Sequence, residues 1–306
     1  MIQSTSGQIT QFLADLDRIQ ATADRAQRQM SSGLKVQRPS DAPDQISEIL
    51  QLRAQISQND QLQNNLATLK SQTDSAESAL QQAISVVEQA TVLATQGSGG
   101  LPDAQTRASM AQQVRGLQQQ LVGLSRTNVS GHFVFGGDQD QDPPYQLNVN
   151  QPNGVDRLTA ASATRQMDDG TGVQFLTSRT AQEIFDHRNS DDTLAPDNVF
   201  AAINGLAVAL ENNDQSAVEN SMIALQRAGD YLNGQLGFYG AVQKRVSEAA
   251  SLASKFQIQQ QTSLSDVQDA DLSAAIVEMT QAQTQQQAAL SAQAQVSKHS
   301  LFDFLG

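Results

Sequence analysis

Apolar residues recur every three or four positions at both ends of this chain. At the N-terminal end the positions are Ile2, Thr5, Ile9, Phe12, Leu16, Ile19, Ala23, Ala26 and Met30. At the C-terminal end the same spacing gives Leu272, Ala275, Met279, Ala282, Gln286, Ala289, Gln293 and Val296, with Ile276, Gln283 and Leu290 beside them, so that three glutamines leave part of this face polar. This is the a/d stripe of a heptad repeat, which predicts a helix that must pack on another helix. Because single helices of this kind are marginal in water, we expect the two ends to pair with each other.

Each terminal helix is separated from the middle of the chain by a break. Gly33 stands where a helix commonly ends, and Pro39 disfavours helical geometry at the preceding residue. Ser40 or Asp41 is expected to cap a new helix that tolerates Pro43 in its first turn. The second break lies at 266–271. We expect the two breaks to meet as one interdomain joint, whose candidate residues are Gly33, Pro39, Pro43, Asp269 and Asp271.

The middle of the chain shows helical spacing on both sides of a short, β-prone region. The run from His132 to Phe135 and the "DDGTG" turn at 168–172 indicate strands and turns. The predicted fold class is mainly α, an elongated helical bundle or coiled coil built from both chain ends with a small inserted β domain. The expected domains are 1–42 with 266–306, then 43–135 with 181–265, and a β insertion at 136–180. Three glycines at 234, 237 and 240 argue against one continuous helix there, by roughly 1 kcal/mol each.

Composition excludes several classes of function. The 306-residue chain has a net charge of −13 and shows no cluster of Lys and Arg, so we expect no nucleic-acid partner. It has no cysteine, which excludes disulfides and Cys-based metal sites. The sequence contains no run of 18 apolar residues, so we expect no membrane span. The first ten residues lack the basic and apolar regions of a cleaved secretory signal, so none is expected.

No pattern indicates a cofactor, a metal or catalysis. Asp138, Asp140 and Asp142 alternate as in a calcium loop, but the sixth and twelfth positions hold Pro143 and Val149 instead of Gly and Glu. The three histidines at 132, 187 and 299 lack zinc-ligand spacing. We therefore expect a structural protein with no cofactor and no enzymatic activity.

Several segments resemble the flagellin family. The stretch "MSSGLKVQRPSDAP" is similar to the end of that family's N-terminal helix, and "SDVQDADLSAAIVEMTQAQTQQQ" is similar to its C-terminal segment. The stretch "GFYGAVQKRV" resembles the place where flagellins re-enter their core from the outer domains. The forms "RPSDAP", "GHFVFGGDQDQDPPY" and "SLFDFLG" look more like the members that join the hook to the filament than like filament flagellin.

The resemblance implies an extracellular adaptor at the hook–filament junction of the bacterial flagellum, exported unfolded by type III secretion. It implies contacts with hook-associated protein 1, flagellin, further copies of this chain and an export chaperone. The terminal stripes would then be the assembly interface, and the closing apolar residues would pack into the tube or bind the chaperone: Leu301, Phe302, Phe304 and Leu305. Filament flagellin is the alternative, and an intracellular coiled-coil signalling protein is a weaker one.

Overall fold

The computed structural model describes residues 2–99, 102–161, 165–168 and 172–305, without the side chains of residues 2–6, 8 and 295–305. The chain divides into two compact units, which we call the terminal unit (residues 1–60 and 256–306) and the central unit (residues 61–255). The division expected from the sequence, with boundaries at 42/43 and 265/266 and a separate β insertion, stays a prediction.

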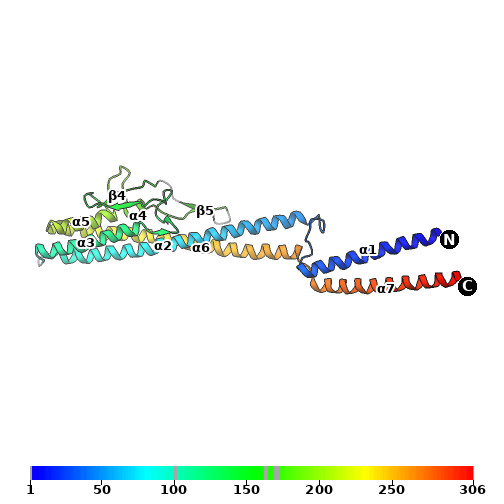
Figure 1. Ribbon diagram of the computed structural model, residues 1–306. Coiled ribbons are helices and arrows are strands. Elements are labelled where there is room, and N and C mark those ends of the chain that lie inside the picture. The colour runs from blue at the N-terminus through cyan, green and yellow to red at the C-terminus, as the bar shows by residue number, and fades with distance from the viewer. Residues whose placement is uncertain (1, 100–101, 162–164, 169–171, 306) are drawn as a thin grey trace. The chain divides into compact units, whose positions relative to one another are not determined.

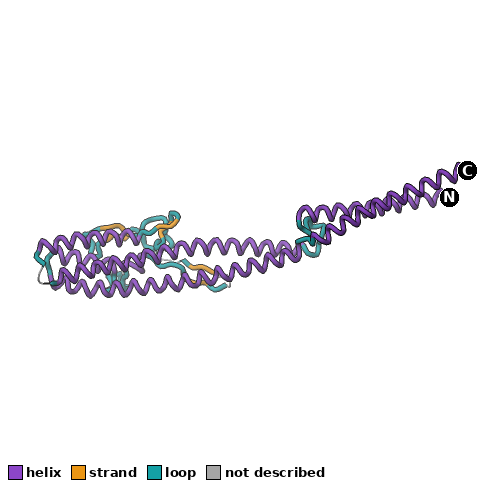
Figure 2. The backbone as a smooth tube through the Cα atoms, turned by 90° about the horizontal axis from the view of Figure 1, so that it is seen from below, coloured by secondary structure: helices purple, strands orange, loops and turns teal. Residues whose placement is uncertain are grey.

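The terminal unit contains both chain ends. Helix α1 (Ile2–Ser32) and helix α7 (Leu272–Leu305) run antiparallel and side by side, with the N- and C-termini at the same end of the pair (Figure 1, Figure 2). The first part of α2 (Ile46–Ser98) and the last part of α6 (Gln215–Gln268) complete this unit. The two terminal helices therefore pair with each other, as the sequence predicts.

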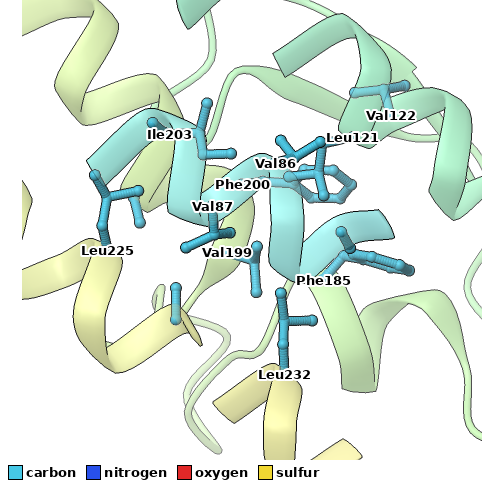
Figure 3. Packing of buried hydrophobic residues seen from close by; sticks show 14 of the residues in the cluster. Val86, Val87, Leu121, Val122, Phe185, Val199, Phe200, Ile203, Leu225 and Leu232 are labelled. Atoms are coloured by element: carbon cyan, nitrogen blue, oxygen red, sulfur yellow. The ribbon is translucent and has the colours of Figure 1, made fainter. Parts of the chain in front are cut away.

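The central unit holds the main hydrophobic core. It packs the rest of α2 and α6 with α3 (Ala104–Ser125) and α5 (Val199–Glu211). Side chains from these helices interleave, as Val86, Leu121, Ile203 and Leu225 show (Figure 3). Helices α3 and α5 begin at side-chain caps: Asp103 accepts a hydrogen bond from the backbone N–H of Thr106 at 2.8 Å, and Asn198 from that of Ala201 at 2.9 Å.

Three short antiparallel strand pairs lie between α3 and α5. They are β1 (Asn128–Val129) with β2 (His132–Phe133), β3 (Tyr145–Leu147) with β4 (Val155–Arg157), and β5 (Gln166–Asp168) with β6 (Gln174–Leu176). A five-residue helix, α4 (Ala181–Phe185), follows them. The predicted fold class, mainly α with a small β region, is confirmed, although α4 has no counterpart in the sequence prediction.

One buried carboxylate ties this region to the helices. Asp186 is fully buried and accepts hydrogen bonds from Tyr145 Oη at 3.1 Å, Asn153 Nδ2 at 2.9 Å and Asn198 Nδ2 at 2.8 Å. It also pairs with Arg188 Nε at 2.9 Å. These four donors come from β3, two loops and the cap of α5, so the carboxylate fixes their relative positions.

Helix α6 is continuous from Gln215 to Gln268, although the three glycines weaken the local preference for a helix. A Cβ atom added at Gly234, Gly237 or Gly240 would meet nothing within 4 Å, so these glycines serve no close packing. The neighbouring Leu232 and Tyr239 are buried in the core, and their packing outweighs the weak helix propensity of glycine.

Candidate assembly interface

The pair formed by α1 and α7 buries few large side chains. Among the described residues of the two helices, those that are fully buried are three alanines, Ala26, Ala275 and Ala282. Phe12, Leu16 and Ile19 of the N-terminal stripe are only half-buried, as is Met279 of the C-terminal stripe. The contact inside one subunit therefore supplies little apolar burial for two helices of 31 and 34 residues.

A row of large apolar side chains on α7 stays exposed. Leu272 is 49% exposed, Ile276 50% and Leu290 50%. These positions lie on one side of the helix, since they are spaced by four and fourteen residues, and exposed Gln283 lies between them. We call this row, Leu272, Ile276, Gln283 and Leu290, the outer stripe of α7. Ile276, Gln283 and Leu290 are the second row that the sequence predicts, whereas Leu272 was expected in the main stripe.

Helix α1 also has exposed large apolar side chains, two of them near its N-terminal end. Ile9 is 48% exposed and Leu13, one turn further, 53%. Met30, near the other end of α1, is 39% exposed. Leu13 was not among the candidates from the sequence, although its spacing of four residues from Ile9 is a signal that would have identified it.

An ion pair links the two helices near the joint. Arg25 Nη2 lies 2.6 Å from Glu278 Oε1, with both side chains partly exposed. Such an exposed pair contributes little stability, but it favours one register of α1 against α7.

Six of the remaining candidate positions near the two ends cannot be compared with side-chain geometry. Ile2 lies in α1, and the others lie in α7, but their side chains fall outside the described set: Val296, Leu301, Phe302, Phe304 and Leu305. Their roles in assembly, tube packing or chaperone binding stay predictions.

The two breaks in the helical pattern meet within the terminal unit. Gly33 has φ +73°, and its N–H donates to Gln29 O at 2.8 Å as α1 ends. Its carbonyl accepts a hydrogen bond from Ala270 N at 2.8 Å, and Lys35 N donates to Gln268 O at 2.7 Å. Leu34 thereby forms an antiparallel bridge with Asp269. This joins Gly33 to the Asp269 turn by backbone hydrogen bonds.

Asp271 and Asp41 bind backbone N–H groups on either side of this bridge. Asp271 Oδ1 accepts from Ser273 N at 2.9 Å and Ala274 N at 3.1 Å, so it caps α7. Asp41 Oδ2 accepts from Arg38 N at 2.8 Å and Gln37 N at 3.0 Å. These two bonds, the one from Arg38 first, lower the pKa of Asp41 below its ordinary value.

Asp41 does not cap the following helix, and this corrects the sequence prediction. Helix α2 begins at Ile46, where Gln45 O accepts the hydrogen bond from Ile49 N. The carboxylate of Asp41 instead binds N–H groups that precede it, and the chain turns again before α2. Pro39 and Pro43 are both exposed and lie in these turns rather than in the helix.

The described residues hold no group of three or more His, Asp or Glu side chains placed to bind a metal ion. Within the same set, no helix combines the length and hydropathy that crossing a bilayer requires.

Two family models match the chain. Residues 4–140 match the bacterial flagellin N-terminal helical region, and residues 223–305 match the bacterial flagellin C-terminal helical region. The matches include both terminal helices and the joint between them.

Curated relatives extend the likeness over nearly the whole chain. The flagellar hook-associated protein 3 of Escherichia coli K12 is 27% identical over 293 residues, which cover 90% of each chain. The protein of the same name from Salmonella typhimurium LT2 is 28% identical over 311 residues, covering 94% of this chain and 93% of the relative. Among solved structures, the flagellar hook-associated protein 3 of Legionella pneumophila superposes with a TM-score of 0.60 at 13% identity, over 72% of this chain and 98% of the other.

Proposed function

Since this chain belongs to the flagellin family, we propose that it is a structural adaptor of the bacterial flagellum that joins hook-associated protein 1 to the filament. The observation that carries the proposal is the likeness, over 90% and 94% of this chain, to two proteins named flagellar hook-associated protein 3. The role we propose is non-enzymatic and extracellular, at the junction between hook and filament.

The exposed side chains of α1 and α7 support an assembling role. A subunit that leaves Ile9, Leu13 and Ile276 about half exposed gains further burial when a neighbour covers them. Repeated heterologous contacts of this kind build rings or helical tubes, in which one type of subunit contacts different neighbours above and below. The proposed neighbours are hook-associated protein 1, flagellin and further copies of this chain.

We also propose that the chain is exported unfolded by type III secretion and that its terminal helices fold fully only on assembly. The absence of cysteine suits passage of an unfolded chain, because no disulfide has to be reduced first. The closing Leu301, Phe302, Phe304 and Leu305 are the proposed binding segment for an export chaperone before assembly.

Deletion of the gene in its own host tests the proposal. The adaptor role predicts cells that keep their hooks and release flagellin into the medium but carry few attached filaments. A plasmid copy of the full chain should restore attachment. A strain that still bears filaments of normal length and number without this chain would refute the junction role.

Filament flagellin is distinguished by the same experiment. A filament subunit would polymerise alone, so its loss would remove flagellin from the medium as well as from the cell. Recovery of this chain as the major protein of sheared filaments would favour that alternative, whereas recovery in a few copies per filament would support the adaptor role.

A further inference from the structure

A groove of about 480 Å³ lies beside the joint in the terminal unit. Its lining includes Arg25, Arg28 and Lys35, together with the carboxylates of Asp41 and Glu278. The segment from Arg25 to Arg38 holds four cationic side chains and no acidic one, in a chain whose net charge is −13. The groove is therefore a local positive site on an acidic protein.

The two carboxylates in the groove are already engaged. Glu278 is ion-paired with Arg25 at 2.6 Å, and Asp41 accepts the backbone N–H groups of Gln37 and Arg38. Neither Arg28 nor Lys35 forms an ion pair with any carboxylate of the described residues. Both side chains are exposed, and the charge of Arg28 also acts on Asp41, where, after the backbone hydrogen bond from Arg38, it contributes to the lowered pKa of that carboxyl.

The same unit carries a complementary acidic segment. Asp266, Asp269 and Asp271 lie within six residues at the end of α6 and the start of α7, and all three are exposed. Asp269 accepts a hydrogen bond from Ser265 Oγ, and Asp271 caps α7. In the part of the chain that the structure describes, none of the three is ion-paired with a Lys or Arg side chain.

We propose that the groove lined by Arg28 and Lys35 binds the Asp266–Asp271 segment of a second copy of this chain. Backbone hydrogen bonds hold Lys35 N close to Gln268 O within one copy. The described residues nevertheless form no ion pair between the groove and the acidic segment, and Arg28, Lys35 and the three aspartates are all exposed. The groove and the segment are different surfaces, so a contact between the groove of one copy and the segment of the next is heterologous. Repetition of such a contact adds copies in one direction. The inference deepens the proposed function, on which it rests, by assigning a self-contact to the joint.

Charge complementarity of this kind chiefly affects the rate and the register of association. The attraction falls when salt shortens the screening length, from about 8 Å at physiological ionic strength to about 3 Å at 1 M salt. The contact therefore has a measurable salt dependence.

Disulfide trapping between copies tests the proposal, because the chain has no cysteine of its own. Ser40→Cys places a thiol in the groove wall, and Ser273→Cys places one beside the acidic segment. The two full-length variants, one lengthened by a tag, are mixed at about 0.5 mM and oxidised. The control replaces Ser273→Cys with Ser57→Cys, an exposed position on α2.

The proposal predicts a mixed dimer from Ser40→Cys and Ser273→Cys that forms about tenfold faster than the control pair and slows to the control rate in 1 M salt. Adding Arg28→Glu and Lys35→Glu to the Ser40→Cys variant should lower its cross-linking rate to that of the control pair. Adding Asp266→Lys and Asp269→Lys to the Ser273→Cys variant should then restore the faster cross-linking. The matched control, Arg18→Glu with Arg53→Glu, changes the same charge outside the groove and should have no effect.

Cross-linking no faster than the control, or unaffected by charge reversal, would overturn the inference. So would a cross-link that appears only after another flagellar protein is added. Filament attachment in cells separates this result from the proposed function: reversed-charge variants that fail to cross-link yet still attach filaments would overturn the self-contact and leave the adaptor role intact.

Discussion

The outer stripe of α7 makes a quantitative prediction about assembly. We would replace Ile276 and Leu290 with glutamine, the residue that already occupies the stripe at Gln283. Glutamine forms helices about as well as leucine, but the subunit already buries about half of each side chain, so the double variant should also cost the monomer up to about 1.5–3 kcal/mol.

The effect on assembly follows from the exposed area. Full burial of an Ile or Leu side chain stabilises by about 1.5–3 kcal/mol, and each of these two side chains is 50% exposed. If a neighbour covers the exposed half, each contributes about 0.8–1.5 kcal/mol to the contact. The double variant should therefore lose about 1.5–3 kcal/mol of association free energy, or roughly 10- to 150-fold in the association constant.

Two assays separate stability from assembly. Thermal unfolding followed by circular dichroism measures the monomer, and sedimentation of the full chain over a range of concentrations measures its association. In cells, the variant should appear in the medium while filament attachment falls. Ala292→Gln, an exposed position on another side of α7, is the matched control. Normal association of the double variant would refute the assignment of the stripe as an interface.

Three further predictions concern the central unit. Asp186→Ala should cost about 3–5 kcal/mol of unfolding free energy, measured by denaturant titration, because it leaves four donors of its network without their acceptor. Gly154→Ala should cost about 1–3 kcal/mol in the same titration, since the residue has φ +76° and an added Cβ would lie 1.9 Å from Gln118 Nε2. Burial raises the pKa of Tyr239 well above its ordinary value and that of Tyr231 to about 12. In the folded protein these phenols stay protonated above pH 10, the ordinary pKa of tyrosine. The stability that they contribute is therefore complete below pH 10 and is lost as the pH rises toward 12. Tyrosinate absorbance and the unfolded fraction should rise together over this range.

The helical part of the fold was predictable because local signals and long-range packing agree. The three-four spacing identified α1 and α7. Gly33 ended α1 as expected, since its positive φ is a conformation that glycine adopts without strain.

The errors lie where tertiary contacts outweigh local preference. Three glycines weakened the local case for one helix at 234–240, but the packing of neighbouring side chains holds α6 continuous. Asp41 had the right side chain for a cap and binds preceding N–H groups instead. The network around Asp186 includes Tyr145, which lies 41 positions away in the sequence, so no local sequence pattern predicts it.

The exposed positions of the candidate interface were only partly predictable. Heptad spacing placed Ile276 and Leu290 beside the main stripe, but it could not tell which of two rows a single subunit would cover. That choice depends on how α7 is rotated about its axis relative to α1. Small buried side chains such as Ala275 and Ala282 let the two helices approach closely on one side of α7.

Hydrogen exchange of the backbone amides, in dilute monomer and in assembled material, is the most direct measurement of whether neighbours complete the terminal helices. We expect the amides of α1 and α7 to exchange rapidly in the monomer, while those in the core helices of the central unit stay protected. In the assembled state, α1 and α7 should gain protection to their outer turns. Strong protection along both helices in the dilute monomer, unchanged on assembly, would contradict the account.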